Sequence, residues 1–244
     1  MPFGTKGVAI AVLSAAVLTT AACSGSGKAA PPPASTSANG TGSTLTADQI
    51  SKVLLTDKDD AGYTFDASKD STSTTDTQDV VTTGGSACQT FVDAQEALST
   101  KYGTTAEVDR QLTNATDGHG IEDSVMAFPS ADKAAAMITD LTSGLSGCKD
   151  LSVTQPGGAV FMAPSAIPEL VKDGQAGYIN TMTAGGKTEL MAAELVQVGT
   201  TVSVVAFIGP VTKDPAALKQ MGGTLLAHLS DVQVQRLKTA QGLS

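Results

Sequence analysis

Alternating apolar and polar positions predict a well-defined β-hairpin in the last quarter of the chain. Gly199-Thr200 fits a two-residue type II′ turn, which takes glycine at its first central position. The register set by this turn pairs apolar residues on one face of the hairpin: Leu195 with Val204, Ala193 with Ala206, and Met191 with Ile208. A shift of one residue would destroy this agreement, so the register is strongly specified. The other face mixes polar and apolar side chains, and we expect it to be less buried.

The same pattern predicts three further strands, at residues 106–113, 121–128 and 175–183. The turn signal Asp117-Gly118 joins the first two of these strands, and Gly185-Gly186 joins the third to the hairpin. Between residues 57 and 85 the chain is polar and rich in Thr and Ser. We therefore expect a long loop there, with room for one strand.

Four segments show features of amphipathic helices. Thr46 and Gln49 form a capping box, and Leu45 and Ile50 form a hydrophobic staple, so a short helix begins near residue 46. Each of the other three segments carries one apolar stripe. The stripe positions are 88, 91, 94 and 98; then 134, 137, 138, 141 and 145; then 218, 221, 222, 225, 229 and 232.

Capping residues mark where two of these helices start. Ser130 caps one helix, and Asp214 with Pro215 at the first helical position opens the last one. Gly222-Gly223 lies inside that last helix, and we expect it to permit a close approach of the helix to the sheet. The sum of these elements predicts an α+β fold, in which helices pack on one face of an antiparallel sheet.

The N-terminus has the features of an export signal. Lys6 is the only charged residue among the first 22, and the apolar run at 8–18 follows it. A basic start, a short apolar region and small residues before a cleavage point are typical of a secretory signal peptide, predicted here at 1–22. The run is too short to span ~30 Å of hydrocarbon as a helix.

Thr20-Ala21-Ala22-Cys23 is similar to a bacterial lipobox, in which the cysteine takes acyl chains and becomes the new N-terminus. We therefore predict lipidation at Cys23 and a cell-membrane location on the extracytoplasmic side. An ordinary cleavage site, with Cys23 as a third disulfide candidate, is the alternative. Residues 23–44 form the lipidated cysteine and a flexible Ser/Gly/Pro linker, since they cannot bury enough apolar area to fold. Residues 45–244 then form a single α+β domain.

The cysteine count agrees with export. If Cys23 carries lipid, Cys88 and Cys148 remain as an even pair in an oxidising compartment, and we predict a disulfide between them. A bridge over a loop of ~60 residues would contribute about 4 kcal/mol. The alternatives are a reactive thiol or a metal site, although two cysteines alone make a poor zinc site.

The composition excludes some functions. The chain has 244 residues, 41% of them hydrophobic, which suffices for a core. It has 15 basic and 24 acidic residues, a net charge of −9, so we expect no binding to nucleic acid. No phosphate-binding loop, dinucleotide fingerprint or zinc-protease motif is present, and we expect neither a cofactor nor a bound metal.

Candidate catalytic residues are sparse. His119 lies in a turn, where we expect it to be solvated, and His228 lies off the apolar centre of the last helix. The segments 84–88 and 144–148 each end in Cys where a G-x-S-x-G nucleophile motif requires Gly. The acidic stretch from Asp57 resembles the start of a calcium-binding loop, but position twelve is Ser68 rather than Glu. We predict no catalytic residue and no enzymatic activity.

From Leu45 to the C-terminus the chain resembles the PknH-like extracellular domain, the sensor region of some mycobacterial receptor kinases, which also occurs in actinobacterial lipoproteins. The resemblance rests on the opening helix at 45–55, the helix that starts at Cys88, the stretch 128–136 that leads to Cys148, and the strand at 194–199 with its partner. It implies a ligand-sensing module with a cleft. It assigns no binding residue to a position in this chain.

Three functions fit these observations. The first is a membrane-anchored, non-enzymatic sensor or binding domain for an unknown small molecule or protein. The second is a carrier of a lipid or another apolar molecule, which would need a deep pocket lined by Met, Leu, Val and Phe. The third is an envelope hydrolase, which would need His119 or His228 within hydrogen-bond reach of a Ser hydroxyl or a carboxylate.

Overall fold

A computed structural model describes residues 42–60, 62–72, 76, 80–116, 119–155, 158–210 and 221–243. These residues all belong to one compact unit, which spans 39–244. The predicted signal peptide, Cys23 and most of the predicted linker lie outside the described residues. The same holds for the turn at Asp117-Gly118 and for the helix cap at Asp214 and Pro215.

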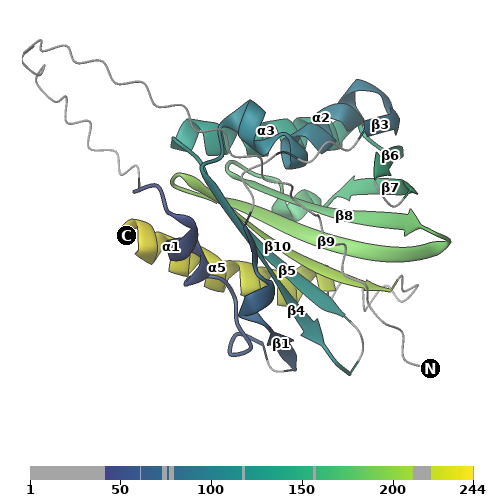
Figure 1. Cartoon of the computed structure of the whole chain (residues 1–244). Helices are drawn as coiled ribbons and strands as arrows, with labels where there is room; N and C mark the ends of the chain where they lie inside the picture. The colour runs from purple at the N-terminus through teal and green to yellow at the C-terminus, as the bar shows by residue number, and fades with distance from the viewer. Residues whose placement is uncertain are drawn as a thin grey trace, which may run out of the picture. The chain divides into compact units, whose positions relative to one another are not determined.

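A ten-stranded antiparallel sheet forms the centre of this unit (Figure 1). Its order is β1-β4-β5-β10-β9-β8-β7-β6-β3, and β2 also pairs with β4. The strands are β1 (Tyr63–Phe65), β2 (Ser71–Thr72), β3 (Val80–Thr83), β4 (Ala106–Asn114), β5 (Gly120–Ala127), β6 (Leu151–Gln155), β7 (Gly158–Ala166), β8 (Gln175–Ala184), β9 (Lys187–Val198) and β10 (Thr201–Pro210).

The predicted hairpin is confirmed to the residue. In the β9–β10 pair, Leu195 faces Val204, Ala193 faces Ala206, and Met191 faces Ile208. Gly199 has a φ of +54°, the left-handed conformation that the first central position of a type II′ turn requires. The three other predicted strands are also present, as β4, β5 and β8.

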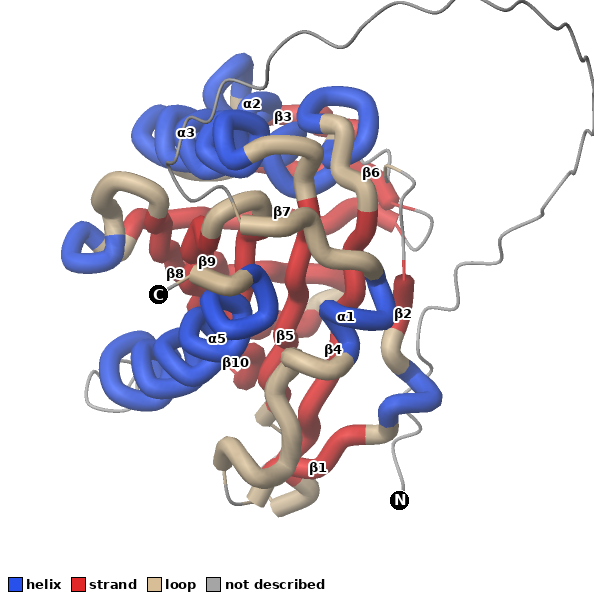
Figure 2. The backbone as a smooth tube through the Cα atoms, turned by 90° about the vertical axis from the view of Figure 1, so that its left-hand side faces the viewer, coloured by secondary structure: helices blue, strands red, loops and turns tan. Residues whose placement is uncertain are grey.

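Helices cover both faces of the sheet (Figures 1 and 2). α2 (Gly85–Glu96) and α3 (Ala131–Gly147) pack on the face that carries Ala193, Leu195 and Ala206. α1 (Ala47–Ser51) and α5 (Leu226–Gln241) lie on the opposite face, where α5 contacts β9 and β10. The predicted α+β class and the antiparallel sheet are confirmed. The predicted helices on one face correspond to the α2–α3 layer, and α1 and α5 form a second layer on the other face.

The reason for the second layer is visible in the hairpin. Val205 and Phe207 point away from α2–α3 and are 1% and 5% exposed, because α5 packs over them. The expectation of a less buried second face is therefore wrong at these positions. The local caps are correct: Thr46 and Gln49 form the reciprocal capping box of α1, and the Ser130 side chain accepts from the amide of Lys133.

Two regions differ from the sequence predictions. The segment 57–85 holds three short strands, β1 to β3, rather than one, and β6 and β7 were not predicted at all. In the last helix, a π-helical turn at Met221–Leu225 precedes α5 and changes the phase of the stripe. Leu226, Leu229 and Leu237 are therefore the buried leucines of α5. Gly223 faces open space, so the predicted close approach to the sheet is wrong there.

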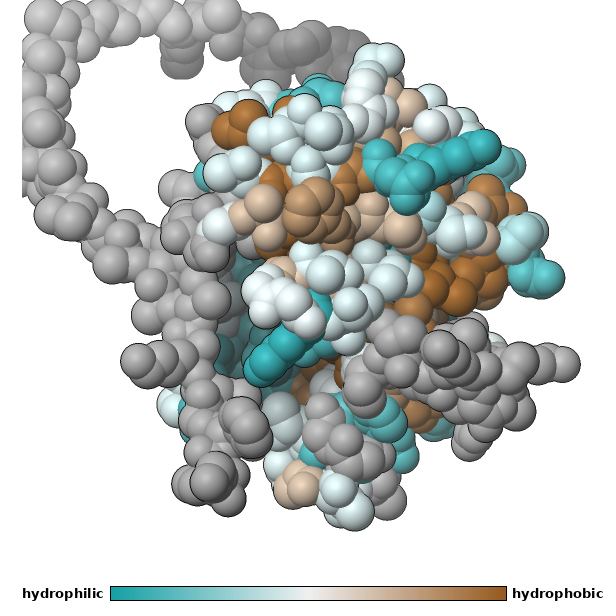
Figure 3. Space-filling model, turned by 90° about the vertical axis from the view of Figure 1, so that its right-hand side faces the viewer, coloured by the Kyte–Doolittle hydropathy of each residue, from teal (hydrophilic) through white to brown (hydrophobic). Residues whose placement is uncertain are grey.

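The predicted disulfide joins Cys88 of α2 to Cys148 at the end of α3. Both cysteines are almost fully buried, at 1% and 2% exposure, within the largest apolar cluster. The part of the sheet beside this disulfide, formed by β3, β6 and β7, carries exposed apolar side chains. Val80 and Phe161 are 60% and 59% exposed, and hydrophobic surface is visible on this side of the molecule (Figure 3).

Candidate functional site

A cavity of about 430 Å³ opens at the outer edge of β4. Its wall comes from the segment 44–47, from Thr72 of β2 and from residues 105–107. Its volume lies in the range of pockets that hold small molecules. Four of its eight lining residues are threonines, and one is a glutamate, so the cavity offers hydroxyl and carboxyl groups beside a larger apolar part.

Local structure explains why this gap exists. The capping box of α1 and the burial of Leu45 hold the N-terminal segment against the core, and the Thr44 hydroxyl donates to the carbonyl of Phe128 at 3.5 Å. On the outer side of β4, β2 pairs only with Val108 and Asp109. Among the described residues, no strand pairs with Ala106 or Glu107 on that side, and the cavity occupies this space.

Glu107 connects the cavity with a row of acidic side chains. Glu107 and Asp109 point to the α2–α3 face of β4, and Glu122 points to the same face of β5. Burial, followed by repulsion from Asp109, Glu122 and Asp76, raises the pKa of Glu107 to about 8. Burial and the charge of Asp109 also raise the pKa of Glu122. Glu107 is therefore mostly protonated at neutral pH, and its carboxyl can donate a hydrogen bond.

The other acidic groups are fixed by hydrogen bonds. The hydroxyls of Ser124 and Ser71 donate to the two oxygens of Asp109, at 2.5 and 2.9 Å. Asp76 accepts from the backbone amides of Ser99 and Thr100, at 2.5 and 3.0 Å. These donors hold Asp109 and Asp76 in fixed orientations, whereas burial raises the pKa values of Glu107 and Glu122.

The acidic row continues across the sheet to a buried tyrosine. Glu122, Ala206, Ala193 and Tyr178 face one another in sequence across four adjacent strands. The Tyr178 hydroxyl donates to Gln95 of α2 at 2.7 Å. Burial, with a smaller contribution from Glu122, raises the pKa of Tyr178. The tyrosine is therefore a neutral hydrogen-bonding group that ties α2 to the sheet.

A second charged cluster holds the N-terminal region in place. Arg110 of β4 makes two hydrogen bonds to Asp70, at 2.9 and 2.6 Å, and stacks 4.5 Å from the ring of Phe65. Arg236 of α5 makes two hydrogen bonds to Asp59, at 3.0 and 2.6 Å. Both arginines also bond backbone carbonyls between residues 51 and 55. This cluster explains the acidic loop near Asp57: Asp59 binds an arginine rather than a metal.

The residues considered as catalytic candidates do not form a site together. His228 is exposed on α5, and His119 lies beside the ring of Phe207, with ring centres 5.0 Å apart. In the described part of the chain, no three residues among His, Cys, Asp and Glu are placed to hold a metal ion. Sequence reasoning missed Glu107 and Glu122. The alternation of acidic residues at 107 and 109 was visible, but it indicated only a polar face.

The fold and the buried disulfide indicate a class of protein, the small disulfide-containing domains of oxidising compartments. A disulfide between two packed helices is typical of domains that work in an oxidising compartment. Comparison with known proteins agrees: the model of the PknH-like extracellular domain matches residues 45–236, and the chain belongs to this family. A search of curated proteins finds no match.

Among solved structures, the chain is similar to the extracellular domain of PknH from Mycobacterium tuberculosis. The two are 17% identical, with a TM-score of 0.58, and the match covers 81% of this chain and 98% of the other. This likeness shows a shared fold. Within the part of the chain that the structure describes, no helix has both the length and the apolar character needed to cross a membrane.

Proposed function

We propose that this chain is an extracytoplasmic sensor domain, anchored to the cell membrane by lipid on Cys23, that binds its ligand in the cavity at the edge of β4. Family membership supports the sensor role. The observation that carries the choice of site is the position of Glu107, whose raised pKa coincides with a cavity of suitable size. Perturbed carboxyl groups beside a cavity are typical of functional sites.

The chemistry of the wall favours a polar ligand. Four threonines, a protonatable carboxyl and nearby Asp109 suit a small molecule with a cationic or hydrogen-bond-donating group. A positive charge beside Glu107 would lower its pKa, so ligand binding would release a proton. We therefore expect affinity to increase between pH 6 and pH 9. A lipid carrier would need a deep pocket lined by Met, Leu, Val and Phe, and Leu45 is the one residue of these types that lines this cavity.

The position of the wall suggests how occupancy could be sensed. Residues 44–47 form part of the cavity and are the first segment of the domain after the predicted linker. A ligand that bridges this segment and β4 would stabilise the start of the domain. The signal would then pass to a partner protein.

The ligand site is tested by native mass spectrometry of the full-length chain purified from its own envelope. We expect a bound small molecule in the wild type and in Glu169→Gln, a control at an exposed glutamate, and its loss in Glu107→Gln. Equal occupancy in all three proteins would contradict the proposed site. For the anchor, Cys23→Ala should release the protein into the medium, and unchanged retention in the membrane would refute lipidation.

A further inference from the structure

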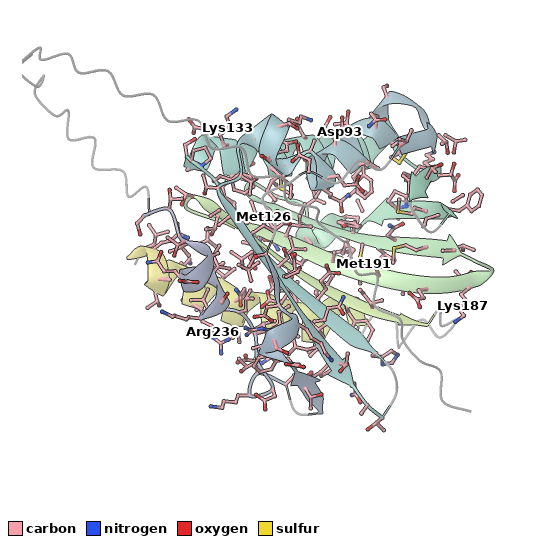
Figure 4. All side chains as sticks on the ribbon, in the orientation of Figure 1. Asp93, Met126, Lys133, Lys187, Met191 and Arg236 are labelled. Carbon is pink, nitrogen blue, oxygen red and sulfur yellow. A yellow bond between two sulfur atoms is a disulfide. The ribbon has the colours of Figure 1, made fainter. Side chains whose placement is uncertain are left out.

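Methionines gather on one face of the sheet. The chain has seven methionines, and four of them, Met126, Met162, Met182 and Met191, point to the α2–α3 face from different strands. Figure 4 labels Met126 and Met191 on the sheet, and Arg236 beside the α1–α5 layer. Met126 is buried in the core, whereas the other three are only half-buried. The half-buried group, here called the methionine cluster, consists of Met162, Met182 and Met191.

Strand register brings the methionine cluster together. Met162 of β7 lies directly opposite Met182 of β8. On the other side of β8, Met182 faces Glu189 of β9, and Met191 follows two residues later on the same face. Directly opposed residues have Cβ atoms about 4.5–5.5 Å apart, and diagonal neighbours about 7–8 Å. Unbranched methionine side chains, with three rotatable bonds, can bring their sulfur atoms together over such separations.

An unpartnered oxygen lies in the middle of the methionine cluster. Asn180 faces Met191 across the β8–β9 pair and is two residues from Met182, so it shares their face. Its side chain is 2% exposed, yet its Oδ1 atom has no hydrogen-bond partner in the described structure. A buried polar oxygen without a partner costs about 1–3 kcal/mol. The dipole of this oxygen would stabilise a positive charge held beside it.

The geometry points to a binding site for a soft monovalent metal ion, Cu(I), held by the thioethers of Met162, Met182 and Met191 beside the Asn180 oxygen. Thioethers are soft ligands that select Cu(I) over hard cations. All three residues are half-buried, so the site is partly open to an ion and partly shielded from bulk water. The site lies on β7, β8 and β9, apart from the cavity at β4, so it does not depend on the proposed ligand site.

The test is competition for Cu(I) by the full-length chain in detergent, against bicinchoninate with ascorbate as reductant. We expect the wild type to withdraw one equivalent of Cu(I) from the coloured complex. Met182→Leu and Met191→Leu should each weaken binding by more than about 10-fold. Met126→Leu and Met137→Leu, which change buried methionines outside the cluster, should bind as the wild type does. Leucine preserves side-chain volume, so folding should be retained.

A second measurement uses the unaltered protein. With ¹³C-methyl-labelled methionine and Ag(I) nitrate in chloride-free buffer, we expect the methyl resonances of Met162, Met182 and Met191 to shift, while those of Met126 and Met137 stay in place. The inference is overturned if the wild type fails to compete for Cu(I), if the leucine variants in the cluster compete equally well, or if the shifts occur at other methionines.

Discussion

The two helical layers are held to the same sheet in different ways. α2 and α3 rest on the largest apolar cluster and are joined by the Cys88–Cys148 disulfide. They also pack closely, since a Cβ on Gly144 would lie 2.5 Å from the backbone nitrogen of Phe91. α5 instead presents Ser230, Gln233 and Gln241 to the sheet among its leucines. One layer is fixed by apolar contact and a covalent bond, and the other by apolar contact together with directional polar contacts.

The layer beneath α5 also contains unsatisfied groups. In the described structure, five buried polar atoms on this side have no hydrogen-bond partner: Asp123 Oδ1, Glu194 Oε2, Ser203 Oγ, and Nε2 and Oε1 of Gln233. Each lowers the stability of the α5 layer, because its bonds to water are lost without replacement. The α2–α3 layer is therefore the rigid frame of the domain. The α1–α5 layer, next to the N-terminal segment, is the less stable of the two layers.

The largest expected effect concerns the disulfide. Replacing both Cys88 and Cys148 by alanine should lower the free energy of unfolding by about 4 kcal/mol, because the unfolded chain regains the entropy of a loop closed across 60 residues. Denaturant unfolding of the wild type and the variant measures this difference. A loss below about 1 kcal/mol would show that the α2–α3 layer does not depend on its covalent link.

The arginine pair on the opposite layer should come next. Arg110→Met removes the bidentate partner of Asp70 and leaves two backbone carbonyls unpaired, so we expect a loss of about 3 kcal/mol. Lys69→Met breaks the exposed pair with Asp66 and serves as the control, and we expect no measurable loss of stability from it. Denaturant unfolding measures both losses of stability. Similar losses in the two variants would argue against the role of Arg110 in holding the N-terminal region in place.

Two glutamines of α5 should respond in opposite directions. Gln233→Leu replaces two unpartnered polar atoms with apolar ones and should raise the free energy of unfolding by about 1 kcal/mol. Gln241→Leu should lower it by about 2 kcal/mol, because the Gln241 amide bonds Thr200, Val198 and Thr201. Equal destabilisation of both variants would show that the Gln233 side chain makes hydrogen bonds in the folded protein, which would contradict this prediction.

The last expected effect is a change of stability with pH. Burial raises the pKa of Asp123 to about 7, although the Leu55 amide, Arg110 and Arg236 oppose this and Asp59 adds to it. A carboxyl with a raised folded-state pKa stabilises the fold at low pH and loses this contribution as the pH rises. The stability of Asp123→Asn relative to the wild type should therefore increase from about pH 4 to about pH 7 and then level off. Unfolding measured across this range gives the result, and a difference independent of pH would contradict it.

Much of the rigid layer could be predicted from the sequence, because its signals are local. The cap at Ser130, the stripe of α3 and the hairpin register each follow from residues within a single helix or a single hairpin. β7 escaped prediction because it contains Pro164 and because Phe161, on its outer face, is exposed. Because an apolar residue also lies on the open face, β7 lacks the alternation of apolar and polar residues from which a strand is predicted.

The candidate site was predictable only in part. Arg110 interrupts the alternation of its strand, and this exception is the buried residue that anchors the N-terminal region. The acidic character of Glu107 is visible in the sequence, but its pKa is raised first by burial and then by repulsion from Asp109, Glu122 and Asp76, of which the last two lie on other segments. Such effects depend on strand pairing across the sheet, which a one-dimensional pattern does not contain.

The most direct test of the proposed ligand site is hydrogen exchange of the full-length chain from its own envelope, compared between the wild type and Glu107→Gln. Because the Glu107 carboxyl is mostly protonated at neutral pH, glutamine replaces it with little change in shape. We predict faster exchange at residues 44–47 and 105–107 together in the variant, with α2 and α3 unchanged. Identical exchange at both walls of the cavity would contradict the assignment of this site.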